Sequence, residues 1–367
     1  MPEVRLIGPN NENVGVVAIQ EALKIARAAS KHDTVDYEDG VWVHRIATRY
    51  FPDRRAPDLG DLPQSVKDRA FTVLDEVTRI AARRGVDVVS WPIWDLEGAA
   101  VAAAEAAPAV LSLHTSYGLA LPSKPDWLNN AAYKRDHVDK VIAGEAQALA
   151  HAPYILANSA QIRTDLAALH GVDLDRAGVL TAPHGLPDVS LSVNAAARDD
   201  DDIELLFVGR LEQRKGVDVL LAALPGLLAN HPHLRVRLIG RAESAAYETG
   251  FKRSHAGAPW LARVAFEGEV SQDVLLDAYA RCDIFVAPSR YESFGLIFLE
   301  AMMFAKPCVG ASVGGVQEVV VHGETGLLAP PGDADALAQA IAALVDDEAL
   351  RHRLGAAGRA RYVKHFT

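Results

Sequence analysis

Two glutamates in the C-terminal half of the sequence are spaced so that both could bind one polyol. Glu292 and Glu300 lie in Pro288–Met302, which follows a short apolar run and turns helical in period at Leu296. Carboxylates accept hydrogen bonds from adjacent hydroxyls, as on a ribose or a hexose. A glycosidase also uses two carboxylates, and a surface helix carries such pairs by chance. The spacing alone leaves all three interpretations open.

A second segment, Gly209–Gly216, offers positive charge. It follows the apolar run Ile203–Val208 and precedes a helical period, so we expect a turn between a strand and a helix. Free amides and the dipole at such a helix start favour an anion, and Arg210 and Lys215 add two cations. A solvated basic loop has the same composition. We interpret the segment as a candidate phosphate site.

The elements that must position these residues alternate between short apolar runs and longer helical segments, which is typical of parallel sheets covered by helices. Strands are predicted at Val4–Ile7, Val41–Ile46, Val86–Trp91, Ala109–His114, Tyr154–Ala157, Ile203–Val208, Leu234–Ile239, Val264–Phe266, Ile284–Ala287 and Pro307–Gly310. Helices are predicted at Val16–Ala29, Pro63–Arg84, Leu128–Ala150, Val217–Leu228 and Ser271–Arg281. The predicted fold class is α/β, with two Rossmann-like doubly wound domains that bind ligand at the carboxyl ends of their strands.

The segment Asn194–Asp202 separates the two halves and contains the acidic run Asp199–Asp202. Such a run can hold a metal ion, but this one has no turn or helix to converge its carboxylates, so a solvated linker is the better interpretation. We therefore predict an N-terminal domain over 1–193, a linker over 194–202 and a C-terminal domain over 203–367. Ligand is expected in the cleft between the domains.

Composition and charge indicate which partners and which cellular compartment to expect. The chain has 367 residues and a net charge of −11, which argues against a nucleic-acid partner. Its two cysteines, Cys282 and Cys308, lie in apolar stretches and favour a reducing compartment. The sequence shows neither a membrane span nor a signal peptide. We expect a cytoplasmic protein, with peripheral membrane contact through the mixed-charge helix Pro63–Arg84 as an open alternative.

Taken together, the motifs of the C-terminal half resemble glycosyltransferase family 4, the retaining group of the GT-B fold with a glycogen-synthase-like donor domain. The resemblance spans roughly residues 203–346 and is looser in the first domain, where Leu111–Gly118 and Tyr154–Gly185 carry it. The matching segments are Gly209-Arg210-Leu211 with Lys215-Gly216, Glu292–Glu300, Val313–Glu318, Gly323–Leu328 and Pro330–Asp333.

The resemblance implies roles for the charged residues. Arg210 and Lys215 would neutralise the pyrophosphate of a nucleotide-diphosphate sugar. Glu300 would bind the ribose hydroxyls, and Glu292 would hold a hydroxyl of the donor sugar. His114, at the end of a first-domain strand, would meet the donor sugar opposite Glu292.

Other positions are implied as backbone contacts. The amides near Phe294, Gly295 and Leu296 would bind sugar and phosphate oxygens, and the turns at Arg241 and Val270 would form the base-binding loops. Gly15 corresponds to the loop glycine near the donor phosphate. Gly314 and Gly315 open the next helix and allow a close approach to a ligand or a helix. Trp91 and Trp94 are candidates for stacking on an acceptor sugar, with core packing as an equal alternative.

The sequence departs from the family pattern at both ends. Ser30–Gly40 is polar and acidic where the family has a strand. The first domain, which the resemblance makes the acceptor side, is therefore expected to be abbreviated or to have lost an upstream segment. The sequence ends at Thr367, before the family's helix that crosses back to the first domain. In Pro183-His184-Gly185, a histidine stands where relatives often have asparagine.

The function that the resemblance implies is retaining transfer of a hexose to a hydroxyl acceptor, with no metal and no cofactor besides the nucleotide-sugar co-substrate. A sugar phosphorylase, a nucleotide-sugar epimerase and a catalytically impaired binding protein are the alternatives. The sequence does not specify the base, the donor sugar, the acceptor or the oligomeric state.

Overall fold

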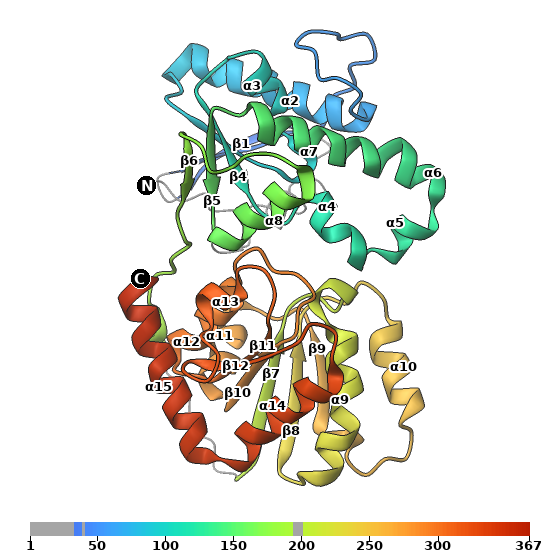
Figure 1. Ribbon diagram of the computed structural model, residues 1–367, viewed down its shortest axis with the longest axis vertical. Helices are drawn as coiled ribbons and strands as arrows, with labels where there is room; N and C mark the ends of the chain where they lie inside the picture. Colours follow the sequence, from blue (N-terminus) through green and yellow to red (C-terminus); the bar gives the residue numbers. More distant parts are fainter. Residues whose placement is uncertain (1–32, 39–40, 194–200) are drawn as a thin grey trace. The chain divides into compact units, whose positions relative to one another are not determined.

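The computed structural model describes residues 33–38, 41–193 and 201–367, which form two compact units (Figure 1). The first comprises the described residues up to Asn158 together with Arg163–Ala182, and the second comprises Ser159–Ile162 and Pro183–Thr367. Four predictions, the strand Val4–Ile7, the helix Val16–Ala29, Gly15 and most of the linker, lie outside the described residues.

The division between the units differs from the predicted domain boundary. Residues 183–193, which the sequence analysis assigned to the first domain, belong to the second unit. They contact its last helix, α15 (Glu348–His365). The amide of Leu186 donates to the carbonyl of Phe366 at 2.8 Å, and the Tyr362 hydroxyl donates to the Leu186 carbonyl at 2.8 Å. These contacts join residues far apart in sequence, so no local pattern indicated them.

The main sheet of the first unit has four parallel strands in the order β3-β4-β5-β6. These strands are β3 (Val89–Pro92), β4 (Ala109–Leu113), β5 (Tyr154–Ala157) and β6 (Val179–Thr181). The accompanying helices are α2 (Gln64–Arg84), η1 (Trp94–Leu96), α3 (Ala99–Ala103), α4 (Tyr117–Ala120), η2 (Leu121–Ser123), α5 (Pro125–Asn129), α6 (Ala131–Tyr133), η3 (Lys134–Val138), α7 (Asp139–His151) and α8 (Ala160–His170).

Two predictions for the first unit are wrong. A strand does form within Ser30–Gly40, because β1 (Thr34–Glu38) pairs antiparallel with β2 (Val41–Arg45). The rings of Tyr37 and Trp42, which face each other in this register, lie 4.8 Å apart. Such a cross-strand aromatic pair stabilises a hairpin that also carries acidic residues.

The predicted helix Leu128–Ala150 is the second error, because its first half is broken. Helix α5 ends at Asn129, α6 covers three residues, and η3 is a π-helical turn before α7 begins at Asp139. Asn130 interrupts the run with a non-helical backbone and caps α6 by accepting from the Tyr133 amide at 3.0 Å. Asparagine favours such local bonds over a helix interior.

The second unit has one six-stranded parallel sheet in the order β12-β11-β10-β7-β8-β9. Its strands are β7 (Ile203–Val208), β8 (Leu234–Ile239), β9 (Val264–Gly268), β10 (Ile284–Ala287), β11 (Cys308–Ala311) and β12 (Gly326–Ala329). The helices are η4 (Ser190–Ser192), η5 (Gln213–Lys215), α9 (Val217–Asn230), α10 (Ala246–Ser254), η6 (Leu261–Arg263), α11 (Gln272–Arg281), α12 (Leu296–Met303), α13 (Val316–Val319), α14 (Ala334–Asp346) and α15. In chain order this is the 3-2-1-4-5-6 arrangement of Rossmann-like domains.

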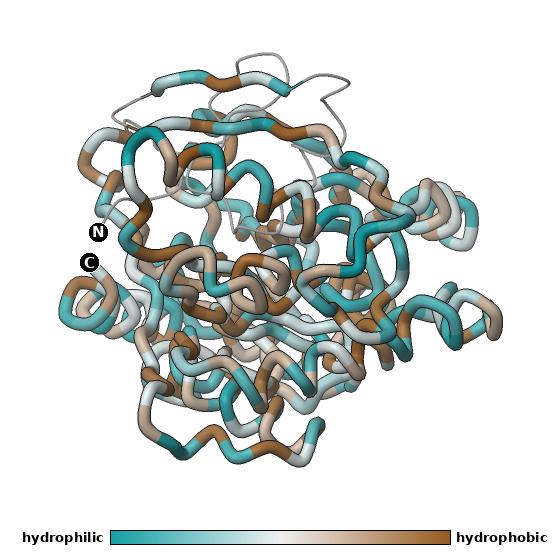
Figure 2. The backbone as a smooth tube through the Cα atoms, turned by 90° about the horizontal axis from the view of Figure 1, so that it is seen from above, coloured by the Kyte–Doolittle hydropathy of each residue, from teal (hydrophilic) through white to brown (hydrophobic). Residues whose placement is uncertain are grey.

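The sheet of the second unit has an apolar core on both faces, because alternate residues of a strand point to opposite sides. Leu205 and Phe207 of β7 pack with α9 and α14 in one cluster, whereas Leu206 and Val208 pack with α11 and α12 in another. In α14 the buried Leu337, Ile341, Leu344 and Val345 follow a helical period. Figure 2 shows this change of hydropathy from residue to residue along the helices.

In the part of the chain that the structure describes, no helix is both long and apolar enough to cross a membrane.

Candidate functional site

The two motif loops meet where the strand order of the second sheet reverses. Strands β7 and β10 are neighbours in the sheet, and the chain runs outward from them in opposite directions. The loop after β7 begins at Gly209, and the loop after β10 begins at Pro288. Ligands of doubly wound domains bind at this topological switch point, outside the carboxyl ends of the strands. The fold therefore brings the predicted cations and glutamates together.

The loop after β7 approaches the second loop closely at Gly216. This residue precedes α9 with φ +68°, and a Cβ atom at this position would lie 1.9 Å from the carbonyl oxygen of Pro288. Only glycine fits such an approach without strain. Arg290 strengthens the junction, because its guanidinium donates to both carboxylate oxygens of Asp218 at 2.6 and 2.7 Å. Its amide donates to the carbonyl of Arg214 at 2.8 Å.

Lys215 and Glu292 form the centre of the site. Lys215 Nζ lies 2.5 Å from Glu292 Oε1 and 3.1 Å from Oε2, and both side chains are largely buried. Burial acts to raise the pKa of Glu292, but the charges of Lys215 and Arg214 outweigh it and hold the pKa below its usual value. Burial lowers the pKa of Lys215, although Glu292 opposes that shift. The lowered pKa keeps Glu292 ionised, and the pair is shielded from solvent.

Two further residues of the segment Gly209–Gly216, for which no role was predicted, complete the charge network. Glu212 is fully buried, and its Oε1 lies 2.8 Å from Arg210 and 3.0 Å from Arg214. Arg214 in turn lies 3.6 Å from Glu292 Oε2. Three cations against two carboxylates leave one positive charge, which suits an anionic ligand. The alternating charges of Glu212-Gln213-Arg214 in the turn between β7 and α9 could have predicted this ion pair.

Helix α12 begins at the same place, with Gly295 at its N-terminus in a left-handed conformation. The first amides of the helix, from Leu296 onward, are the expected donors to sugar or phosphate oxygens. Phe294 is buried beside this start, and the ring of His184 packs edge-on against it at 5.3 Å. Burial lowers the pKa of His184, so the ring is neutral at pH 7.

Glu300 lies about one turn into α12, which begins at Leu296. Its Oε2 accepts from the Tyr279 hydroxyl at 2.6 Å. Burial raises the pKa of Glu300, whereas the hydrogen bond from Tyr279 and the positive charge of Lys215 act to lower it. Hydrogen bonding of Glu300 to a ribose stays a prediction.

The loop that carries Glu292 is clamped from the other side by Gly314 and Gly315. The amide of Gly315 donates to the carbonyl of Glu292 at 3.0 Å. A Cβ atom on Gly314 would lie 2.0 Å from that carbonyl oxygen, and one on Gly315 would lie 2.4 Å from the carbonyl of Ser293. The close approach predicted for these glycines is therefore to the loop after β10.

The predicted base-binding turns lie at the ends of the next two strands, β8 and β9. Gly240 donates its amide to the carbonyl of Gly268 at 2.7 Å, which joins the two turns. Arg241 accepts from the amide of Leu211 at 2.9 Å and exposes its side chain. Val270 is partly buried against the core. Their contact with a base stays a prediction.

His114 follows β4 in the first unit. The segment after it is held by Glu145 of α7, whose buried carboxylate accepts from the amides of Tyr117 at 2.6 Å and Gly118 at 3.3 Å. His170 Nε2 lies 3.7 Å from Glu145 Oε2, the oxygen that accepts from Gly118. Burial raises the pKa of Glu145 to about 8, although the amides act to lower it. The role of His114 toward a donor sugar stays a prediction.

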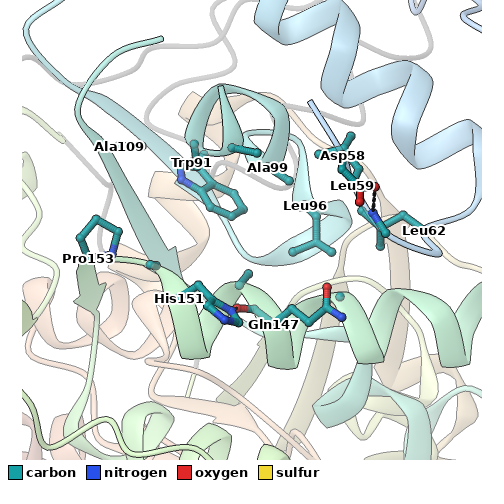
Figure 3. Close-up of a pocket in the computed structure, with 16 residues that line it drawn as sticks. Asp58, Leu59, Leu62, Trp91, Leu96, Ala99, Ala109, Gln147, His151 and Pro153 are labelled. Atoms are coloured by element: carbon teal, nitrogen blue, oxygen red, sulfur yellow. Dashed lines mark hydrogen bonds between the residues drawn. The ribbon is translucent and has the colours of Figure 1, made fainter. Parts of the chain in front are cut away.

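A pocket of about 490 Å³ in the first unit lies elsewhere (Figure 3). Trp91, Leu96 and Ala99 line one side, and Gln147 and His151 of α7 line the other. Trp91 is only 4 % exposed, which favours its packing role over the alternative of stacking on a sugar. Among the described residues, no group of three His, Cys, Asp or Glu side chains is arranged to hold a metal ion.

The chain is similar to known glycosyltransferases. The sequence profile of glycosyl transferases group 1 matches residues 191–361. A D-inositol 3-phosphate glycosyltransferase of Xylanimonas cellulosilytica is 31% identical over 91% of this chain and 81% of its own length. Glycogen synthase of Mycobacterium tuberculosis is 31% identical over 65% of this chain. That match covers 56% of the synthase, so the chain spans just over half of its length.

Solved structures show the same fold. Sucrose-phosphate synthase (tll1590) of Thermosynechococcus elongatus superposes with a TM-score of 0.70 at 23% identity, over 93% of this chain and 83% of its own. Anabaena Alr3699/HepE, solved in complex with UDP and glucose, superposes with a TM-score of 0.61 at 21% identity. That match covers 80% of this chain and 77% of HepE. The chain has the α/β fold of the GT-B class and belongs to the glycosyl transferases group 1 family.

Proposed function

We propose that the protein is a retaining glycosyltransferase that moves a hexose from a nucleotide-diphosphate sugar to a hydroxyl acceptor without a metal ion. The observation that carries the proposal is the buried network of Lys215, Glu292, Arg210, Arg214 and Glu212 beside the start of α12. Its excess of positive charge suits the phosphates of a nucleotide sugar, and its carboxylate Glu292 suits a sugar hydroxyl. The HepE complexes with UDP and with UDP-glucose support this ligand class.

The phosphates of the donor bind the positive side of the site in this proposal. Arg210 and Lys215 neutralise the pyrophosphate, together with the free amides at the start of α12. Arg210 is the most accessible of the three cations, with 31% of its side chain exposed. Glu212 orients it, because a fully buried carboxylate fixes the guanidinium that it contacts.

The sugar and the ribose bind the two glutamates. Glu292 accepts a hydroxyl of the donor sugar, and its contact with Lys215 keeps it ionised and ready to do so. Glu300 accepts the ribose hydroxyls while Tyr279 holds one of its carboxylate oxygens. His114 is the proposed sugar contact from the first unit.

Catalysis in this proposal is electrostatic. The bond from the anomeric carbon to the β-phosphate oxygen breaks, and the nucleoside diphosphate leaves with the electron pair. The acceptor hydroxyl attacks the same face, and its proton passes to the leaving phosphate, so the configuration is retained. Arg210, Lys215 and the α12 amides stabilise the departing charge, as preorganised donors do in a site shielded from water. No side chain is required as a nucleophile.

The test is the turnover of UDP- and GDP-sugars, measured side by side with Arg210→Ala. We expect this variant to lose about 10²-fold in turnover and to keep its fold, because Glu212 retains Arg214 as a partner. Lys252→Ala, which removes an exposed cation that pairs with Glu248, is the matched control. Near-normal rates in Arg210→Ala sink the donor assignment.

The finer claims have their own measurements. Full activity in EDTA supports metal independence, and loss of activity that Mg²⁺ restores refutes it. The anomeric configuration of the product, followed by proton NMR, decides between retention and inversion. Turnover that requires inorganic phosphate and no nucleotide identifies a phosphorylase instead.

A further inference from the structure

An aromatic cluster in the first unit is not explained by the donor site. It consists of Trp94, Tyr117, Trp127, Tyr133 and His137, which come from η1, α4, α5, α6 and η3. The ring of Tyr117 lies 4.5 Å from that of Trp94 and 4.7 Å from that of Trp127. Tyr133 stacks on His137 at 4.9 Å with an interplanar angle of 13°.

The cluster stands at the edge of the sheet where a ligand is expected. Strands β3 and β4 are parallel neighbours, so their carboxyl ends share one edge. Trp94 follows β3, and Tyr117 follows β4 three residues after His114. The helices α5 and α6 that carry the other rings form an excursion between α4 and α7 (Figure 1). Open α/β sheets bind ligands at this edge.

The rings are less buried than the side chains of a hydrophobic core. Tyr117 is buried, but Trp94, Trp127 and His137 are only partly buried, and Tyr133 is 38% exposed. The core cluster formed by α2 and α3 in the same unit is instead mainly aliphatic, with Leu74 and Val101 among its members. Aromatic residues that stay half exposed are typical of binding surfaces, where one side of the ring is apolar and the other is wet.

Asp95, a buried residue with a strained backbone, lies beside Tyr117 of the cluster. Asp95 is 7% exposed and accepts from the Tyr117 hydroxyl at 2.5 Å. Its backbone is left-handed, with φ 57°, and Leu96 follows with φ 51°. Two consecutive non-glycine residues in this conformation cost free energy, and such strain concentrates at functional sites.

The backbone that carries His137 is unusual as well. Lys134–Val138 is a π-helical turn, a conformation that is rare and frequent at functional sites. The turn places His137 against Tyr133 and Tyr117. The strain at Asp95 and the π-turn lie on different segments of the chain, and both adjoin the same set of rings.

The charges of this surface favour an uncharged ligand. Lys134 pairs with Asp139 at 2.5 Å, and Arg135 pairs with Asp136 at 2.5 Å. Burial lowers the pKa of His137, so its ring is neutral at pH 7. A phosphate or carboxylate would meet the carboxylate of Asp95 and cations that are already paired. A sugar ring instead offers an apolar face for the aromatic rings and hydroxyls for Asp95.

We propose that Trp94, Tyr117, Trp127, Tyr133 and His137, with Asp95, bind the glycosyl acceptor, and that this acceptor is an uncharged sugar. The acceptor role rests on the transferase function proposed above, whereas the binding of a neutral sugar does not. Trp127 and Tyr133 stack on the ring, and Asp95 and Tyr117 contact its hydroxyls.

The test is binding to the full chain, measured by calorimetry and by saturation-transfer NMR. The probes are maltotriose and methyl α-D-mannopyranoside, with glucose 6-phosphate as the charged comparison. We expect a neutral probe to bind and Trp127→Ala to weaken it roughly five- to tenfold, as for the loss of one aromatic contact. Trp127→Phe retains a ring and should restore most of the binding. Tyr50→Ala, which removes a 72% exposed ring outside the cluster, is the matched control.

Several outcomes overturn the proposal. They are no binding of either neutral probe, preference for glucose 6-phosphate, and equal binding in wild type and Trp127→Ala. If Trp127→Ala melts at a lower temperature, Tyr133→Ala at the exposed edge replaces it. Donor hydrolysis without acceptor is measured in parallel. Transfer that survives in Trp127→Ala refutes the acceptor surface alone, whereas absence of nucleotide-sugar turnover in wild type refutes the transferase function alone.

Discussion

The carboxyl edges of the two sheets are built in different ways. In the second unit, the loops at this edge pack closely through their backbones. Gly216 approaches the carbonyl of Pro288, and Gly314 approaches the carbonyl of Glu292. The charged side chains there form one buried network. In the first unit, short helices and a π-turn form the edge, and aromatic rings and a strained Asp95 hold it together.

In the proposed function, the two edges recognise different ligands. A pyrophosphate and a ribose have fixed geometry and charge, so contiguous motifs with buried ion pairs suit them. An acceptor varies between members of a family, and exposed loops with adaptable rings accommodate such variation. We therefore expect substitutions in the second unit to act strongly on both stability and turnover, and those in the first unit to act on binding.

The largest expected effect is at Lys215. Lys215→Met leaves the buried Glu292 without its 2.5 Å partner. Turnover should fall by about 10²–10³-fold, and the free energy of unfolding should fall by about 3–5 kcal/mol. Adding Glu292→Gln should restore most of the stability and none of the turnover. Urea denaturation and steady-state rates check both expectations, and a double variant no more stable than Lys215→Met contradicts the pairing.

The next effect is at Gly314. An alanine there must adopt φ +46° and place its Cβ 2.0 Å from the Glu292 carbonyl oxygen. We expect a loss of about 3 kcal/mol in the free energy of unfolding. Gly226→Ala is the matched control, because no atom lies within 4 Å of its Cβ and it sits inside α9. It should stabilise the protein by about 0.5–1 kcal/mol. Equal effects at the two glycines would argue against the clamp.

In the first unit, Glu145 is expected to make the stability of the protein depend on pH. Its pKa is raised to about 8 by burial, whereas the unfolded value is about 4.3. The folded state thus holds a proton that the unfolded state releases, so this group's contribution to stability decreases from about pH 4.3 to pH 8, by at most about 1.4 kcal/mol per pH unit. Glu145→Gln should flatten the dependence of melting temperature on pH in that window. An unchanged slope would show that Glu145 does not titrate there.

The smallest effect concerns a helix cap of the second unit. Asp333 caps α14 by accepting from the Ala336 amide at 2.9 Å, whereas α2 of the first unit begins without a side-chain cap. Asp333→Ala should lower the free energy of unfolding by about 1 kcal/mol, and Asp333→Asn should retain most of it. Thermal melts compare the two variants, and identical melting temperatures would show that the cap contributes nothing.

The sequence predicted the second unit better than the first. The predicted bounds of β7, β8 and β10 match their strands residue for residue. Buried parallel strands are rich in Val, Ile and Leu, and β8 keeps these residues at alternate positions around Arg235 and Arg237. Strand β1 and the break in the helix before α7 were missed, whereas β2 lies within the predicted strand Val41–Ile46. Both depend on a cross-strand pair and on a local cap at Asn130, which periodicity does not show.

The sequence by itself determined the family and the motif loops, because Gly209–Gly216 and Pro288–Met302 keep their chemistry within short stretches of chain. The strand order then decided that these loops meet, since β7 and β10 become neighbours only in the folded sheet. Tertiary packing also decided that Glu212 and Arg214 belong to the site, and that residues 183–193 join the second unit. The burial of Glu212 and the contacts of residues 183–193 with the end of α15 arise only when the chain folds, so no short stretch of sequence indicates them.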